Sequence, residues 1–194
     1  MAPARARPGV DCAEKIDRTS AFDKIAVHLD GFDGLVTRLA RRLVEHLRRL
    51  TVEINELTTE ITARVRVPAP SLLAVVGCGP LTAAKILGET ANVRRFRSKD
   101  AFARHNGTAP LPVWSSNHER HRLSRTGNRQ INAALHRIAL TQARCYPPAR
   151  ALLDRRKANG DGGMEAMRVL KRRLSDIVYR AMITDNESML SVAA

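Results

Sequence analysis

Residues 36–61 read VTRLARRLVEHLRRLTVEINELTTEI and contain neither proline nor glycine. Apolar side chains recur every seven residues at two interleaved positions, which is the a/d pattern of a coiled coil, here over about four heptads. Pro68 and Pro70 follow, and proline ends a helix. The pattern therefore predicts one long helix over residues 32–67. The seam positions are Val36, Ala40, Leu43, Leu47, Leu50, Ile54, Leu57 and Ile61.

Two arrangements of this helix fit the seam. It is either a core helix of a bundle or an arm that pairs with a second copy of the chain. Charged side chains fill its outer face, as at Arg41, Arg48 and Glu56. That polar face and the length of the pattern favour the arm. We therefore expect a homo-oligomer that forms through residues 36–61.

The segments on either side of this helix complete the predicted organisation. Residues 1–31 are expected to form an N-terminal arm that is partly disordered, residues 68–183 a compact helical domain, and residues 184–194 a tail. No segment shows the period-two alternation that is typical of strands. The predicted fold class is therefore mainly α, with a long coiled-coil arm before a compact helical domain.

A glycine-rich turn opens the second domain. Residues 71–87 read SLLAVVGCGPLTAAKIL, in which Gly77 and Gly79 flank a cysteine and Pro80 suits the first position of a helix. Apolar residues on both sides make residues 71–88 resemble a helix-hairpin-helix motif. The N–H groups at the start of the second helix would bind a phosphate, and Lys85 would add a positive charge. The alternative is a plain helical turn.

The charge of the chain points to a polyanionic partner. There are 33 Lys and Arg residues against 19 Asp and Glu residues, a formal net charge of +14. Hydrophobic residues make up 44%, which favours a packed core over a basic tail, and aromatic residues only 4%, which argues against recognition by base stacking. Contacts to the phosphate backbone of DNA fit this composition better.

Cysteine usage and hydropathy bear on the compartment. Cys12, Cys78 and Cys145 are isolated and odd in number, so they form neither a disulfide framework nor a paired metal site. The longest apolar run, residues 72–76, is far too short to cross a membrane. We expect a cytoplasmic protein without a membrane partner.

The stretch VWSSNHERHR, residues 113–122, combines hydroxyl, imidazole and guanidinium groups. Ser115 and Ser116 are either a nucleophile with its activating surroundings or loop hydroxyls beside a solvated basic face. His118 and His121 form a lone HxxH, so zinc is not expected. The candidate phosphate-binding side chains in and after this stretch are Arg120, Arg122, Arg125, Asn128 and Arg129.

Taken in order, these segments resemble the C-terminal half of the DEDD-type insertion-sequence transposases of the one-ten class, also called bridge-RNA-guided recombinases. The resemblance covers residues 32–183. It rests on the helix-hairpin-helix-like segment, on Gly107 and Pro110 before the serines, and on the Gly127-Asn128-Arg129 sequence that leads into a helix.

The resemblance implies a DNA-binding enzyme in which a serine forms a covalent link to a DNA phosphate. Ser116 matches the family nucleophile best and Ser115 is the second candidate, although Asn117 stands where the family usually has glycine. The partners it implies are DNA and a guide RNA.

The family's other half is an RNase H-like domain whose four carboxylates hold divalent metal, and this sequence shows nothing similar. We therefore expect a truncated chain with no cofactor of its own. The alternative is a non-catalytic remnant that binds DNA or RNA and dimerises. A helix-hairpin-helix repair or ribosomal protein would explain the glycine turn but not the serine and Gly-Asn-Arg segments.

Overall fold

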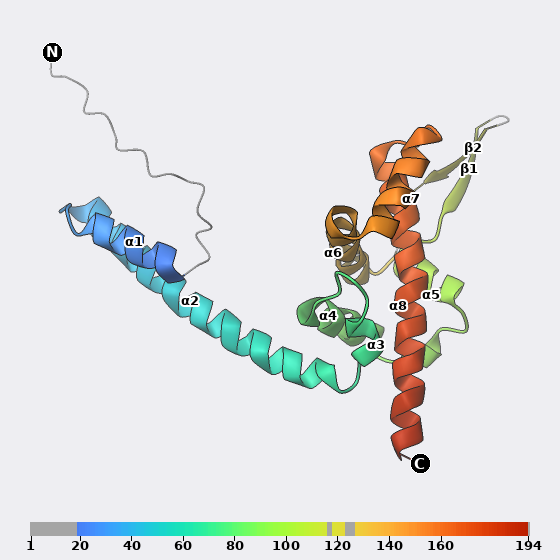
Figure 1. Cartoon of the computed structure of the whole chain (residues 1–194), viewed down its shortest axis with the longest axis horizontal. Helices are drawn as coiled ribbons and strands as arrows, with labels where there is room; N and C mark the ends of the chain where they lie inside the picture. The colour runs from blue at the N-terminus through green and yellow to red at the C-terminus, as the bar shows by residue number, and fades with distance from the viewer. Residues whose placement is uncertain (1–18, 116–117, 123–126, 194) are drawn as a thin grey trace. The chain divides into compact units, whose positions relative to one another are not determined.

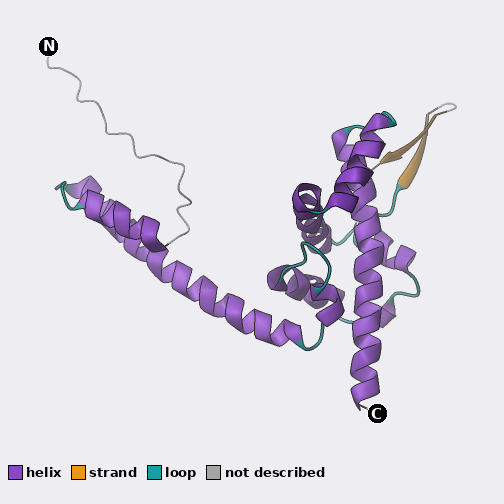
Figure 2. Ribbon diagram, in the orientation of Figure 1, coloured by secondary structure: helices purple, strands orange, loops and turns teal. Residues whose placement is uncertain are grey.

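The structure is a computed structural model that describes residues 19–115, 118–122 and 127–193, with the backbone alone at 112–115, 118–122 and 192–193. The chain is mainly α-helical, as predicted (Figure 2). It divides into two compact units, one up to Leu57 and one from Thr58 onward. None of the helices in the described part of the chain is long and apolar enough to cross a membrane.

The first unit is a pair of helices. α1 (Thr19–Leu29) lies along the first half of α2 (Leu35–Arg66), as Figure 1 shows. The Arg48 side chain donates to Asp23 at 2.6 Å, and Arg41 donates to the carbonyl of Leu29 at 2.9 Å. The sequence predicted a partly disordered arm over residues 1–31, whereas residues 19–29 of that segment are helical because they have α2 to pack against.

The long predicted helix is present as α2, but its apolar seam is largely uncovered within the first unit. Val36, Leu43 and Leu57 are 81%, 63% and 57% exposed. The buried residues of this unit include Phe22 of α1 and Val44 of α2, which are 2% and 7% exposed. The seam therefore lies beside the face that α1 covers.

The second unit is built around α8 (Gly163–Ala193), against which most of the other helices pack (Figure 1). Its core consists of apolar side chains from every α-helix of the unit, several of them without any exposed surface. The surrounding elements are α3 (Pro70–Leu73), α4 (Pro80–Thr90), the 3-10 helix η1 (Val93–Arg95), α5 (Lys99–His105), α6 (Arg129–Cys145) and α7 (Pro147–Ala158).

α8 is longer than the sequence predicted. Residues 184–194 were expected to form a tail, but the helix continues to Ala193. Asp185 gives the physical reason, because its carboxylate is 3% exposed and accepts hydrogen bonds from the backbone N–H groups of Ser71 at 2.8 Å and Leu72 at 3.1 Å. The last turns of α8 therefore hold the start of α3.

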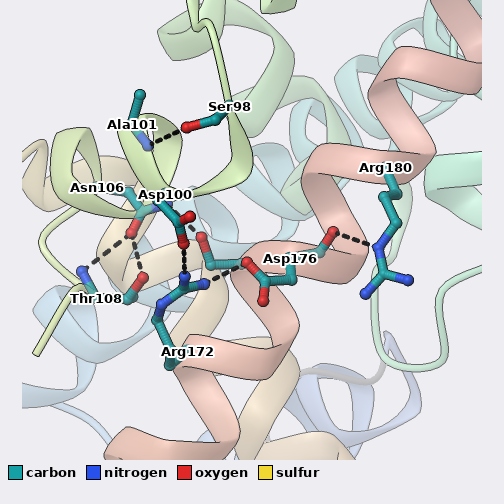
Figure 3. A network of polar contacts seen from close by, with 9 residues as sticks. Ser98, Asp100, Ala101, Asn106, Thr108, Arg172, Asp176 and Arg180 are labelled. Atoms are coloured by element: carbon teal, nitrogen blue, oxygen red, sulfur yellow. Dashed lines mark hydrogen bonds and ion pairs between the residues drawn. The ribbon is translucent and has the colours of Figure 1, made fainter.

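An ion-pair network joins α5 to α8 (Figure 3). The guanidinium of Arg172 pairs with Asp100 of α5 at 2.5 Å and with Asp176 one turn along its own helix. Nearby, Phe102 is fully buried between Phe96 and Tyr179, with ring centroids 5.3 and 5.8 Å away. Phe102 belongs to the core, and Phe96 is half-buried against it.

A two-stranded antiparallel hairpin projects from this helical unit (Figures 1 and 2). β1 (Leu111–Ser115) pairs with β2 (His118–Arg122), with Leu111 opposite Arg122 and Ser115 opposite His118. The sequence predicted no strand, because no segment shows period-two alternation. Residues 111–122 lack apolar alternation, so the pairing left no sequence pattern.

Candidate nucleic-acid interface

The turn between α3 and α4 places its two glycines in different environments. Gly77 has a φ of +84°, which L side chains rarely adopt, and an added Cβ would lie 3.1 Å from the Cβ of Thr141 and 3.2 Å from the carbonyl oxygen of Ile138. Gly79 has nothing within 4 Å of such an atom. Gly77 therefore allows the turn to pack on α6, while Gly79 leaves the start of α4 open to approach.

The N-terminus of α4 is the first place where an anion could bind. Gly79 is its N-cap, Pro80 follows, and no side chain caps the first turn. The N–H groups of such a turn point outward and carry partial positive charge. Lys85 is half-buried farther along the helix. The structure thus gathers Gly77 and Gly79 at this end of α4 and places Lys85 more than one turn away.

The second feature is the base of the hairpin, where the chain leaves and rejoins the helical unit. A Cβ on Gly127 would lie 2.3 Å from the backbone nitrogen of Gly107. Next to this contact, the backbone N–H of Asn128 donates to the carbonyl of His105 at 2.6 Å. The two legs of the hairpin are therefore fixed against each other at their base.

Asn128, a predicted phosphate-binding residue, has a structural role. Its Oδ1 accepts from the N–H groups of Gln130 at 2.9 Å and Ile131 at 3.0 Å, which makes it the N-cap of α6. Its Nδ2 donates to Glu89 of α4 at 2.7 Å. Asn128 therefore ties the hairpin base to α4 and α6.

The remaining predicted residues fall on or near the hairpin. Ser115 ends β1, and Arg120 and Arg122 belong to β2, where they pair with Val113 and Leu111. Ser116 and Arg125 lie outside the described residues. Arg129 is exposed as the first residue of α6.

A cavity of about 350 Å³ lies beside the hairpin base and is called here the Lys171 cavity. Gly107 and Gly127 form one side of it, and Arg129 and His136 of α6 and Arg168 and Lys171 of α8 line the rest, together with Asn132 and Met167. None of its described lining residues is acidic. The cavity is therefore positively charged and has no carboxylate of its own to balance the charge.

A chain of buried hydrogen bonds holds Lys171 in place. The ammonium donates to Oδ1 of Asn132, whose Nδ2 donates to the carbonyl of Asn106 at 2.8 Å. Asn106 is fully buried and donates in turn to Ser175 Oγ at 2.8 Å. The orientation of Asn132 is thus fixed from both ends, so its oxygen faces the lysine. Lys171 keeps further N–H groups, because an ammonium has three.

The positive charges in the Lys171 cavity destabilise one another. Burial, and then the nearby Arg168 guanidinium, lower the pKa of Lys171 below its ordinary 10.5. Burial and then Lys171 itself lower the pKa of His136 below 6.5. A bound anion would offset both shifts, because it would stabilise the charged forms of Lys171 and His136.

A second, more open cavity is also lined by Gly127. Its volume is about 760 Å³, and Arg97, Arg104, His105 and Asp100 are among the residues that line it. Asp100 is already paired with Arg172 at 2.5 Å, so the carboxylate is committed to α8 (Figure 3). Gly127 therefore lines two basic cavities.

Sequence reasoning missed His136, Arg168 and Lys171. Lys171 stands in the run VLKRRLSD, where it reads as one more solvated cation of an amphipathic helix. Only the fold shows that it is 8% exposed and bonded to an α6 side chain. One available signal was the spacing of Asn132 and His136, which lie four residues apart and therefore share a helix face.

Comparison with known proteins agrees with the resemblance found in the sequence. Residues 69–154 match the model of the Transposase IS116/IS110/IS902 family. That segment runs from the start of α3 to within α7, so it contains the glycine turn, the hairpin and all of α6.

Three curated relatives match a larger part of the chain. The insertion element IS900 uncharacterized 42 kDa protein of Mycobacterium paratuberculosis is 28% identical over 78% of this chain and 39% of its own length. A probable family 20 transposase of Pseudomonas aeruginosa is 32% identical over 62% of this chain and 39% of its own length. The insertion element IS110 uncharacterized 43.6 kDa protein of Streptomyces coelicolor is 29% identical over 87% of this chain and 42% of its own length. The chain thus spans about two fifths of the length of these relatives.

Proposed function

We propose that this chain is the DNA-binding, serine-bearing part of an insertion-sequence transposase of the IS116/IS110/IS902 family. The observation that carries the proposal is the position of the family match. Residues 69–154 include the open N-terminus of α4, the hairpin with Ser115, and the glycine contact at the hairpin base. The part of the chain that is similar to transposases therefore also contains most of the groups to which we assign phosphate binding.

Charge and geometry support DNA as the ligand. The formal net charge is +14, and the two cavities beside Gly127 are lined by arginine and lysine side chains. Guanidinium groups bind phosphate in a bidentate manner, and an uncapped helix start binds it through N–H groups. Such contacts follow the backbone of a duplex and give affinity with little sequence preference.

The chemistry proposed for the hairpin is a transesterification. The hydroxyl of Ser116, with Ser115 as the second candidate, attacks a DNA phosphorus; a P–O bond to the serine forms and the P–O bond to one deoxyribose oxygen breaks. His118 or His121 takes the serine proton and returns it to the leaving oxygen. The phosphoserine link conserves the ester, so the strand can be joined to another end without a nucleotide cofactor.

The resemblance places divalent metal in an RNase H-like domain. Within the described residues of this chain, no three His, Cys, Asp or Glu side chains come together. The proposal assigns no ligand and no step to a metal here. The same proposal includes a guide RNA as a partner of the chain and self-association through residues 36–61.

The test is to trap the covalent intermediate. The chain, supplemented with an RNase H-like domain of the family, a guide RNA and a labelled donor duplex, should give a protein–DNA adduct that resists denaturation. Ser116→Ala should abolish the adduct and leave duplex binding unchanged, because only a hydroxyl is removed. Ser115→Ala is the matched control and should reduce the adduct much less.

Two outcomes would contradict this assignment. An adduct that survives Ser116→Ala and disappears in Ser115→Ala would move the nucleophile to Ser115. Duplex binding with no adduct under any of these conditions would favour the alternative, a chain that binds nucleic acid without catalysis.

A further inference from the structure

The Lys171 cavity combines three features that a binding site for a single phosphate group requires. It is concave, with a volume of about 350 Å³ that holds such a group and several waters. It presents the guanidinium groups of Arg129 and Arg168 and the ammonium of Lys171. None of its described lining residues carries a negative charge.

Lys171 is the least expected of these groups, because a lysine that is 8% exposed normally has an acidic partner. Here it donates to the neutral Asn132, and Asn132 is fixed in turn by the carbonyl of Asn106. A cation held by a neutral amide keeps its full charge and spare N–H groups for a ligand. Burial also strengthens its interaction with an anion, since the local dielectric constant is low.

The position of the cavity indicates which phosphate it would take. Gly107 and Gly127 line it, and these residues lie just before β1 and just after β2. A five-residue strand extends about 16 Å, whereas phosphates follow one another every 3.4 Å or so along one strand of a duplex. A phosphate at the base of the hairpin is therefore several nucleotides away from one at Ser115.

We propose that the Lys171 cavity binds one backbone phosphate of the DNA substrate, several nucleotides from the phosphate that the hairpin serine attacks. This assignment rests on the proposed function. Arg129, Arg168 and Lys171 bind the phosphate oxygens, and Asn132 positions Lys171. The cavity fixes where the strand lies relative to the hairpin, so these are binding residues and take no part in bond formation.

Methionine methyl groups give a direct reading of the cavity. Met164 and Met167 line it, whereas Met182 is 3% exposed in the core and Met189 is 50% exposed near the end of α8. In chain labelled with ¹³C-methyl methionine, inorganic phosphate should shift the NMR signals of Met164 and Met167 and leave those of Met182 and Met189 in place. Lys171→Gln, which keeps an N–H donor for Asn132 but loses the charge, should abolish these shifts.

Duplex DNA provides the second reading. Loss of one phosphate contact should lower the slope of log affinity against log salt by about 0.9. Lys171→Gln and Arg168→Gln should each show this loss. Arg173→Gln is the matched control, because it removes one charge from an exposed site on the same helix that does not line the cavity. Melting curves establish that each variant folds. If Lys171→Gln does not fold, Arg168→Gln, three residues earlier on the same helix face, provides the second test.

The outcomes separate this inference from the proposed function. Methionine shifts together with a selective loss of the salt slope support the phosphate site. Equal losses in Arg168→Gln and Arg173→Gln, with no shift of Met164 or Met167, would overturn it while DNA binding itself stands. If the unaltered chain binds no DNA at any salt concentration, the proposed function is wrong, and with it the assignment of the cavity to a DNA phosphate.

Discussion

A Cβ atom on Gly127 would lie 2.3 Å from the backbone nitrogen of Gly107 and 2.5 Å from its Cα. Both distances are below any that real Cβ atoms show, and the atoms in the way belong to backbone. The backbone of residue 127 therefore touches that of residue 107 in a way that only glycine permits. This contact closes the base of the hairpin, and Gly127 also lines both basic cavities.

Gly127→Ala should consequently destabilise the second unit by about 1–3 kcal/mol, as overpacking typically does. Gly88→Ala is the control, because an added Cβ at that position of α4 meets nothing within 4 Å. Alanine in a helix is favoured over glycine by about 1 kcal/mol, so the control should be neutral or more stable. Denaturant unfolding of both variants measures the difference, and equal stability would contradict the close contact.

Asp185 offers a second prediction, about how α8 holds the start of α3. Asp185→Ala leaves the N–H groups of Ser71 and Leu72 without their acceptor, and Leu72 is fully buried. The free energy of unfolding should fall by about 1–3 kcal/mol, the usual cost of an unsatisfied buried donor. Glu187→Ala, at an exposed site on the same helix, should have little effect. Thermal melting that shows the same change for both variants would argue against this role of Asp185.

His105 makes the structure sensitive to pH in a defined direction. Arg95 Nη2 lies 3.2 Å from His105 Nε2, and because a guanidinium only donates, this imidazole nitrogen must accept and the ring is neutral. Burial first, and then Arg95, lower its pKa below 6.5, while Glu89 raises it. As pH falls below about 6.5 the unfolded chain takes up this proton first, so stability should decrease in that window.

Titration of the His105 ring by NMR tests the balance of charges. The pKa should rise in Arg95→Gln and fall in Glu89→Gln, so the two variants control for each other. A pKa at or above 6.5 in the unaltered chain would show that the arginine contact does not hold in solution.

The sequence predicted the parts of the fold that carry a periodic pattern. α2 was predicted from the apolar residues that recur every seven positions in residues 36–61. Asp185 could not be recognised in this way, because its partners Ser71 and Leu72 are more than 100 positions away in the chain. For this reason the sequence alone predicted a tail over residues 184–194.

The candidate interface was predictable to a similar extent. The turn glycines and Asn128 were found from local residue types, although Asn128 proves to be a helix cap that also contacts Glu89. Lys171 was not found, because only its burial and its hydrogen bond to Asn132 on another helix distinguish it from a solvated lysine. Sequence reasoning finds groups that act through their own backbone segment and misses those that act across two helices.

The last prediction concerns the exposed seam of α2. Leu43 is 63% exposed in the single chain and lies between Val36 and Leu50 in the heptad series. If this seam pairs with a second copy, Leu43→Asp places a charge in the interface and should convert a dimer into a monomer. Arg38→Asp, which also introduces a carboxylate at an exposed site of α2, should leave the dimer intact. Light scattering gives the mass, and circular dichroism establishes that the helices persist. A dimer that survives Leu43→Asp would place the contact elsewhere, and an unaltered chain that is monomeric at all concentrations would exclude pairing through this seam.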